Sequence, residues 1–539
     1  MPQDQESHPV SRRLFLGGAA VAGVTSAGLL TPAGSRARAE EPAQPHPTSR
    51  AAFDRLDAAI NNGNSVKDET NDKDSSGLSG KLAWREAYAL EGYALMYQAH
   101  RDTYYLDKMV DHIDHVLANR DSERGVTDYA GNSHPAWRAD HLYTIGFTTV
   151  PDSSGRPMFE VRTALSWGDV TTVTITAGSG AGTFRLEAHN TFHNRTTLYE
   201  NLSVDPASPD YALKRMFEGF RYEKPNRVLL TIRDLRDQPS GQDEISQGQF
   251  PMVSAPYVYG AHTGSIVHPM ALFARLVRED EALMSDPTYR NRAELYLEAA
   301  ADAVAVHDPE WRENEEGEGY YVAQAGAPVW NAGFDNAIGH FTPLGRAIVQ
   351  LARVTGDRQY VERANAMGWT VRNSLVSDGR AWIWPSWWQK GAPYNGWDID
   401  NPRSGFWPWY PPNRIIKNTS HAQHDVNFAR DLHEAGLPGR PPFPDLAIRR
   451  FAATFTDNMM TFTEDGSPSV FRLVDGSRGI GTSGQEQMST GFADLATWDS
   501  RVLDHSVAIL ANHMELGRLT MESAMYCLAR VNHAAGATA

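Results

Sequence analysis

The feature that most constrains this fold is a helical hairpin that recurs along the chain. An apolar pattern of period 3.6, a short polar break and a second such pattern occur over residues 82–117, 270–307 and 343–375, and weaker copies follow over 424–460 and 506–534. One hairpin cannot bury its apolar face alone, so such copies stack on their neighbours. The pattern therefore predicts an open solenoid or a closed ring of helix pairs.

The connections between the hairpins favour the closed ring. They are long, rich in Trp, Gly and Pro, and different each time, whereas the repeats of an open solenoid resemble one another and are joined by short loops. Long loops of this kind carry binding and catalytic residues on a rigid scaffold. We expect a mainly α protein, an (α/α) toroid whose loops gather at one rim around a cleft.

One segment departs from the helical pattern. Between about residues 156 and 235 the chain alternates with period 2, as in "DVTTVTITAG", "GTFRLEAHN" and "RVLLTIRDL", and is enriched in Val, Thr and Ile. Helical patterns lie on both sides of it. We predict antiparallel strands inserted in the toroid as a small β-sandwich, which either binds an outer part of a glycan or braces the rim.

The first residues resemble a signal for export. Arg12 and Arg13 precede Phe15 and a stretch rich in Gly and Ala, and "ARA" then ends at Ala39. This order resembles a twin-arginine signal peptide over residues 1–39. A polar, flexible leader around one short helix would follow over 40–80, and the catalytic body would span 81–539. The prediction is a secreted protein; the alternative is a cytoplasmic protein with a chance arginine pair.

Charge and hydropathy exclude some partners. The 539 residues carry a formal net charge of −16, which opposes binding to nucleic acid or to an anionic membrane. No apolar run of about 18 residues occurs outside the N-terminus, so no membrane span is expected in the mature chain. Cys527 is the only cysteine and leaves no intramolecular disulfide to form.

A tryptophan-rich loop predicts contact with sugar. Seven of the 14 tryptophans fall between residues 382 and 409, where Pro and Gly interrupt any long helix. Indole faces pack on the apolar faces of pyranose rings and keep an N–H for hydroxyl groups. We expect Trp387, Trp397 and Trp407 to bind substrate, and the alternative is a hydrophobic plug that closes the ring.

Several inner helices are expected to begin with polar clusters. The stretch "VWNAGFDNAIGHF" holds Asn331, Asn336 and His340, "NTSHAQHD" holds Asn418 and His421, and "YGAHTG" holds His262. In a toroid such helix starts meet at one rim, so these residues are candidates for the site. The alternative is that they are helix caps and buried histidines.

Metal and cofactor chemistry find little support in the sequence. His421 and His424 are three residues apart but lack a third ligand nearby in the sequence, so we predict no metal site. We predict no cofactor either.

The chemistry left open is hydrolysis or elimination. Hydrolysis of a glycoside needs a pair of carboxylates, which Asp335, Asp398, Asp400 or the run 313–318 could supply without a decisive motif. Elimination from a uronic acid needs a group that neutralises its carboxylate and His or Tyr to move protons. A local excess of cations around the Trp-rich loop favours the anionic substrate; they are Lys390, Arg403, Arg414 and Lys417.

The helical hairpins, the Trp-rich loop and "NTSHAQHDVNFA" together resemble (α/α)-toroid polysaccharide lyases of the alginate and glucuronan type, over most of residues 81–535 apart from the strands. An inserted β segment in place of a C-terminal β domain departs from several of these lyases. The resemblance implies a neutralising amide, a base, an acid and a carboxylate-binding arginine. The matching positions are Asn336 or Asn418, His340 or His421, Tyr394 or Tyr410, and Arg403.

The resulting expectation is a secreted polysaccharide lyase that cleaves a uronic-acid-containing polysaccharide by β-elimination. Its partner would be an anionic polysaccharide. The alternatives are an (α/α)-toroid glycoside hydrolase, a uronyl epimerase, and a non-catalytic glycan-binding protein of the cell surface.

Overall fold

The computed structural model describes residues 44–61, 78–220, 228–398, 400–401, 403–404 and 409–538. The predicted export signal, about half of the predicted leader and Trp407 lie outside these residues. Contacts join Pro45–Ala539 into one unit. The short helix expected in the leader is present as α1 (Arg50–Asn61).

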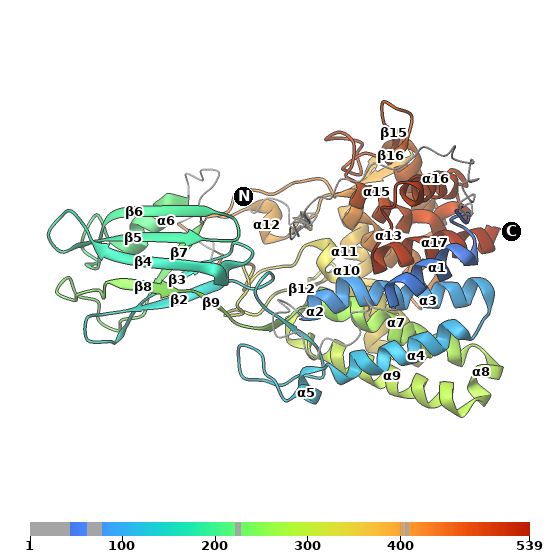
Figure 1. Ribbon diagram of the computed structural model, residues 1–539, viewed down its shortest axis with the longest axis horizontal. Helices are drawn as coiled ribbons and strands as arrows, with labels where there is room; N and C mark the ends of the chain where they lie inside the picture. The colour runs from blue at the N-terminus through green and yellow to red at the C-terminus, as the bar shows by residue number, and fades with distance from the viewer. Residues whose placement is uncertain are drawn as a thin grey trace, which may run out of the picture. The chain divides into compact units, whose positions relative to one another are not determined.

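Inner helices stand side by side, each in contact with the next, and α17 packs on α3 to close a ring. Figure 1 shows blue α3 and red α17, from opposite ends of the chain, in the same group of helices. In chain order the ring consists of η1 with α3 (Leu82–Glu86, Ala87–His100), α7 (Gly260–Arg278), α10 (Ile338–Thr355), α13 (Thr419–Ala435), α15 with η5 (Ser483–Ser489, Thr490–Thr497) and α17 (Glu522–Thr538).

A second set of helices packs on the outside of this ring. α1 packs on α17, and the others pack on the inner helix that is nearest in sequence. They bury one face and leave the other polar, as in α4, where Leu106, Met109 and Ile113 are buried. These outer helices are α4 (Tyr104–Ala118), α9 (Pro287–Ala305), α11 (Arg358–Ser374), α14 (Asp445–Ala453) and α16 (Arg501–Glu515).

Small residues let the inner helices approach one another. A Cβ on Gly264 of α7 would clash with the backbone of Leu344 in α10, and a Cβ on Gly345 would lie 2.7 Å from the ring of Phe428 in α13. Larger side chains at these positions would therefore push neighbouring inner helices apart. Close packing buries most side chains of the inner helices, polar ones included, such as Asp425 and Arg430 in α13.

Caps set the ends of the helices. The Asp286 side chain accepts a hydrogen bond from the backbone N–H of Thr288, and Pro287 takes the first position of α9. α10 ends at Gly356, whose φ of 67° suits glycine. Such signals allowed the helical hairpins to be located in the sequence.

The strands form two four-stranded antiparallel sheets that enclose a separate apolar core. Burial alternates strictly along β5, as period 2 requires. One sheet has the order β7-β3-β2-β9 and the other β6-β5-β4-β8. Their bounds are β2 (Gly146–Pro151), β3 (Pro157–Thr163), β4 (Thr171–Ala177), β5 (Thr183–Asn190), β6 (Arg195–Ser203), β7 (Leu230–Asp234), β8 (Gly248–Pro251) and β9 (Val253–Ser254).

Short strands and short helices lie in the loops. Two-stranded sheets pair β1 (Arg138–Ala139) with β10 (Tyr257–Val258), β11 (Trp311–Glu313) with β12 (Gly319–Tyr321), β13 (Val376–Asp378) with β14 (Ala381–Ile383) and β15 (Met460–Phe462) with β16 (Pro468–Val470). The short helices are α2 (Leu78–Lys81), α5 (Asp121–Arg124), η2 (Gly168–Val170), α6 (Ala212–Phe220), α8 (Glu281–Ser285), η3 (Asp308–Glu310), α12 (Ala392–Asn395) and η4 (Thr454–Met459).

One end of the sandwich meets the loops of the ring. The N–H of Ile145, just before β2, donates to the carbonyl of Pro328 at 2.8 Å. Ala164 and Leu229 pack against an aromatic cluster of ring loops formed by Phe334, Trp397 and Tyr410. The strands therefore contact the part of the ring that holds the candidate site.

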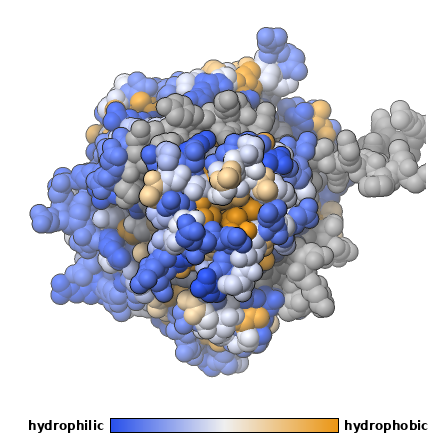
Figure 2. Space-filling model, turned by 90° about the vertical axis from the view of Figure 1, so that its left-hand side faces the viewer, coloured by the Kyte–Doolittle hydropathy of each residue, from blue (hydrophilic) through white to orange (hydrophobic). Residues whose placement is uncertain are grey.

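The predicted (α/α) toroid with antiparallel strands is confirmed. The strands of the sandwich run from Gly146 to Ser254, a wider range than the predicted 156–235. No helix among the described residues is both long and apolar enough to cross a bilayer. Figure 2, which turns the left-hand side of Figure 1 toward the viewer, shows a mostly hydrophilic face with a small hydrophobic group near its centre.

Candidate active site

Inner helices bring histidines together at one rim of the ring. His262 lies in the first turn of α7, His340 in the first turn of α10 and His421 in the first turn of α13. The His421 ring helps lower the pKa of His340, and His340 helps lower that of His262, so the three imidazoles are neighbours. The expected convergence of these helix starts is therefore present.

The rim histidines are neutral near pH 7. Desolvation, with smaller contributions from His421 and Lys417, lowers the pKa of His340 to about 4, and desolvation and Lys417 do the same for His421. Both side chains are nevertheless exposed to solvent. The two observations are compatible, because a ring can contact water and still be surrounded by enough protein atoms to lose much of its hydration. His262 is buried, and burial lowers its pKa to about 3.

Aromatic side chains that the sequence analysis did not select surround these histidines. The Trp84 indole N–H donates to His262 Nε2 at 3.2 Å, and its ring also lies 5.8 Å from that of His424. The Tyr143 ring lies 4.5 Å from the His262 ring, and the Tyr88 hydroxyl lies 3.5 Å from His424 Nε2. The signal for Trp84 and Tyr88 was their place near the start of the first inner helix, the counterpart of His262 in α7.

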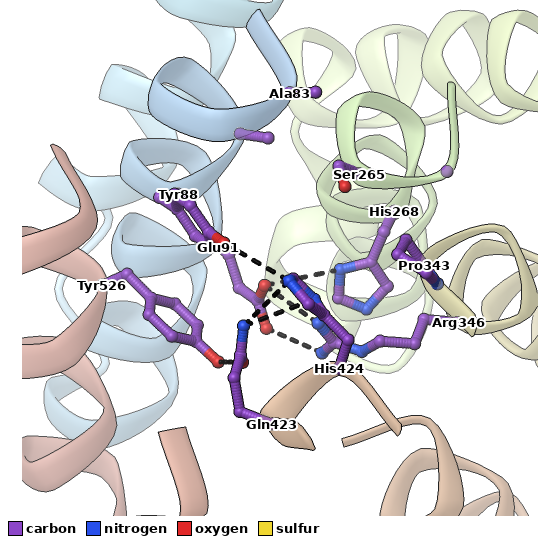
Figure 3. A pocket seen from close by; sticks show the side chains of 12 residues that line it. Ala83, Tyr88, Glu91, Ser265, His268, Pro343, Arg346, Gln423, His424 and Tyr526 are labelled. Carbon is purple, nitrogen blue, oxygen red and sulfur yellow. Dashed lines mark hydrogen bonds and ion pairs between the residues drawn. The ribbon is translucent and has the colours of Figure 1, made fainter. Parts of the chain in front are cut away.

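A small cavity lies below the rim on the ring axis. Its volume, measured as the space open to the centre of a water molecule, is about 20 Å³, enough for one or two waters. Figure 3 shows Tyr88, Gln423 and Tyr526 on one side of it and His268 and Pro343 on the other. A second cavity, of about 200 Å³ by the same measure, shares Glu91, His268 and Arg346 with it, so side chains divide the space at the axis of the toroid without filling it.

Buried ion pairs form the floor of this cavity. Arg346 bonds Glu91 at 2.7 Å (Figure 3). Arg346 also bonds Asp431 at 2.7 Å, and the Arg530 guanidinium bonds Glu91 as well. Burial raises the pKa of the Glu91 carboxyl, but the facing arginines overcome this effect and hold it well below its usual range. Glu91 therefore stays ionised and serves to join inner helices across the axis.

The cations expected to attract an anionic substrate are mostly engaged with protein groups. Lys417 is buried and lies 2.8 Å from Asp425, which also accepts from the Trp384 indole at 2.9 Å. Lys390 pairs with Glu318 at 2.6 Å and with Glu316. Arg414 lies over the Tyr394 ring at 5.3 Å. Lys390 and Lys417 are thus paired with carboxylates, so the local excess of positive charge is smaller than the sequence implied, and it no longer argues for a uronate.

The Trp-rich loop is mostly packed. Trp387 and Trp397 are each 7% exposed. Trp397 stacks on Tyr410 with ring centroids 4.8 Å apart, and Trp387 meets Trp330 edge to face at 5.6 Å. Most of both indoles therefore contacts protein, as in the alternative of a plug, and their contact with sugar stays a prediction.

The other predicted residues are divided between the rim and structural roles. Asn418 caps α13, because its side-chain oxygen accepts from the Ser420 N–H at 2.8 Å. Asn331 donates to Asn336 at 2.7 Å in the loop before α10. Tyr410 is buried, its pKa is raised by burial, and its hydroxyl accepts from Asn413 at 3.1 Å. Tyr394 is half-buried and Arg403 exposed.

One carboxyl group stands apart from the paired acids. Asp335 is 5% exposed, its Oδ1 accepts the Ala392 N–H at 2.7 Å, and its Oδ2 has no hydrogen-bond partner among the described residues. Burial raises its pKa to about 6, although the Ala392 N–H favours the ionised form. A Cβ on Gly391 would clash with Oδ2, so glycine is needed for the carboxyl to fit here.

No group of His, Cys, Asp and Glu in the described part of the chain has the geometry to hold a metal ion. The groups available for chemistry near the rim therefore include neutral imidazoles, tyrosines and carboxyl groups of the loops, among them Asp335 and the exposed Asp398. In the sequence Asp335 is one of several acids that could belong to a carboxylate pair or cap a helix, because burial and a missing partner cannot be read from a sequence.

Neither the protein-family models nor the curated proteins give a match to this chain. Among solved structures, one similar chain is an alpha-1,6-mannanase of glycoside hydrolase family 76 from Salegentibacter sp. HEL1_6, an inactive variant with alpha-1,6-mannotetrose. It is 15% identical with a TM-score of 0.31, over 52% of this chain and 77% of the other. Another is a family 76 glycoside hydrolase from a bovine Bacteroides thetaiotaomicron strain, 10% identical with a TM-score of 0.30, over 74% of this chain and 100% of the other.

These findings correct the expected family and enzyme class. The similar structures described above are glycoside hydrolases, so the resemblance to polysaccharide lyases, the β-elimination and the uronic-acid substrate expected from the sequence were wrong. The physical reason for the error is that His, Tyr, Asn and Trp in toroid loops are common to many sites for sugars. Likeness at this level assigns no activity to the chain.

Proposed function

We propose that this protein is a glycoside hydrolase that acts on a polysaccharide, with Asp335 as the general acid. The observation that carries the proposal is the environment of that carboxyl group: it is nearly buried, one oxygen has no partner, and its pKa is about 6. A general acid must keep its proton near the working pH and release it to the leaving oxygen. A buried carboxyl with an unpaired oxygen meets both needs.

The second carboxylate of such a pair is assigned to Asp398. It is exposed and follows Trp397, whose ring packs 4.9 Å from that of Phe334, the residue before Asp335. The two acids therefore extend from neighbouring positions of one aromatic cluster. A solvent-exposed carboxylate can activate water or attack the sugar, and the distance between the two carboxyl groups in the complex decides which.

Hydrolysis then follows in three parts. Asp335 gives its proton to the glycosidic oxygen as the bond to the anomeric carbon breaks. Asp398 either takes a proton from the attacking water or bonds to the anomeric carbon until water replaces it. The neutral imidazoles of His340 and His421 can each donate and accept hydrogen bonds, which suits sugar hydroxyl groups.

The catalytic pair of the mannanase is not carried over. The inactive variant of that enzyme has two consecutive aspartates replaced, and this chain of 539 residues contains no two consecutive aspartates. The proposal therefore names the reaction class and leaves mannan as one polysaccharide among those to be tried.

The test is a panel of neutral and acidic polysaccharides incubated with the full chain. We expect new reducing ends on at least one of them and no ultraviolet-absorbing unsaturated product. Asp335→Asn should abolish this release, and Asp237→Asn, an exposed acid in the sandwich, is the matched control. Unsaturated ends, or full activity of Asp335→Asn, would overturn the proposal.

A further inference from the structure

The end of the sandwich that meets the ring carries a stacked pair of aromatic rings with no part in the proposed catalysis. Trp167 lies between β3 and β4, and Phe192 between β5 and β6. Their centroids are 5.2 Å apart and their planes differ by 28°. Phe192 is 61% exposed and Trp167 half-buried, so part of the apolar surface of the stacked pair faces water.

A buried amide fixes both loops. The Asn190 side chain is fully buried, and its Nδ2 donates to the carbonyl of Trp167 at 2.8 Å and to the hydroxyl of Thr171 at 2.9 Å. Its Oδ1 accepts the N–H of His193 at 2.9 Å. One side chain thus holds the loop of Trp167 against the loop of Phe192, and the pair of rings is organised before any ligand arrives.

The backbone around the pair is held in uncommon conformations. His141, Trp167 and Asn194 have φ of 48°, 59° and 50°, and they make up half of the six non-glycine residues with positive φ in the described chain. Gly146 and Gly168 pack backbone to backbone, since a Cβ on either would clash with the other. Such conformations cost free energy and tend to occur at functional sites.

The ring pair continues a line of rings that begins at the active-site rim. Tyr143 packs on His262 of α7 at 4.5 Å, and His141, two residues before it, lies 6.4 Å from Trp167. Polar groups flank the line: His141 bonds the Asp169 carboxylate, and His193 Nε2 lies 2.9 Å from the carbonyl of Ser166. Apolar faces with polar groups beside them match a pyranose ring, which has C–H faces and an edge of hydroxyl groups.

We propose that Trp167 and Phe192 form a second carbohydrate-binding site, which holds a part of the polysaccharide that extends beyond the active site. The choice of ligand rests on the proposed function, because the line of rings joins this site to the rim where that polysaccharide would be cleaved. A long polymer bound at both places gains avidity that a short oligosaccharide lacks.

The test is affinity electrophoresis of the full chain in native gels that contain mannan, xylan, a β-glucan or polygalacturonate. The Asp335→Asn background prevents hydrolysis in the gel. We expect Phe192→Ala to weaken retention by about tenfold, since stacking on an aromatic ring contributes about that much. Trp167→Gly removes the other ring, and glycine tolerates the φ of 59° at this position.

The matched control is Phe462→Ala, which removes a ring of similar exposure, 57%, from the β15 hairpin. Retention that depends on Phe192 and Trp167 but not on Phe462 supports the site. The proposal is overturned if both variants are retained like the parent, or if the control loses as much retention as they do. It is also overturned if no polymer retains the parent. A dimer of the parent that Phe192→Ala dissociates without changed retention also overturns it, because the occupant is then a second copy.

The two proposals fail separately. Retention that depends on Phe192 without release of reducing ends refutes the hydrolase and leaves the binding site. Release of reducing ends with unchanged retention refutes only the binding site.

Discussion

Replacing Asp335 by Asn should stabilise the protein near neutral pH while removing its activity. The pKa of Asp335 is raised from 3.8 to about 6 in the folded state. The Asp335 carboxyl group therefore makes its full contribution to stability below about pH 4. This contribution is lost as the pH rises through 6, because the carboxyl group ionises more readily in the unfolded chain than in the folded one. A shift of about two pKa units corresponds to about 3 kcal/mol at most.

The measurement is urea unfolding of the wild type and Asp335→Asn at pH 4 and pH 7, followed by tryptophan fluorescence. The difference in unfolding free energy between the two proteins should move in favour of the variant by about 2–3 kcal/mol from pH 4 to pH 7. Comparing the two proteins at each pH removes the contribution of other titrating groups. Part of this gain in stability is offset. The side-chain N–H₂ of the variant can take the position of Oδ2, where no hydrogen-bond partner lies, and a buried N–H₂ without a partner costs free energy.

The same variant should lose a factor of about 10² or more in kcat, since a general acid contributes that much. A difference in stability that is equal at pH 4 and pH 7 would refute the reasoning about burial. A pH-dependent difference in an active variant would leave the burial argument intact and refute the catalytic role.

Further predictions concern export, the rim and the helix behind it. We propose that the chain is exported by its arginine pair, and replacing Arg12 and Arg13 by Lys should leave folded protein inside the cell, seen by immunoblotting of cell fractions. His421→Ala should lower kcat/KM by about tenfold with an unchanged melting temperature, since the ring is exposed to solvent at the rim. Val426→Ala in the same helix should do the opposite, lowering the unfolding free energy by about 1–2 kcal/mol with normal kinetics, because Val426 is 1% exposed. Gly391→Ala should abolish activity and destabilise the fold, seen by calorimetry, because its methyl group would clash with the general acid.

The sequence alone determined the scaffold, because its signals are local. Period 3.6 on both sides of a short break locates a helical hairpin, and period 2 with Val and Thr locates the strands. The convergence of His262, His340 and His421 also followed, since each opens an inner helix and inner helices of a toroid start at the same rim. No tertiary contact was needed for these conclusions beyond closure of the ring.

Only the tertiary structure decided what the polar and aromatic residues do. Lys417 reads as a surface cation in the sequence, but the fold buries it against Asp425. Asp335 could be a helix cap by its place in the sequence, but the fold packs it against Gly391, desolvates it and leaves one oxygen unpaired. A pKa and a spare hydrogen-bonding group depend on distances between segments remote in the chain. Residue types alone therefore suggested elimination, and the environment of one carboxyl group favours hydrolysis.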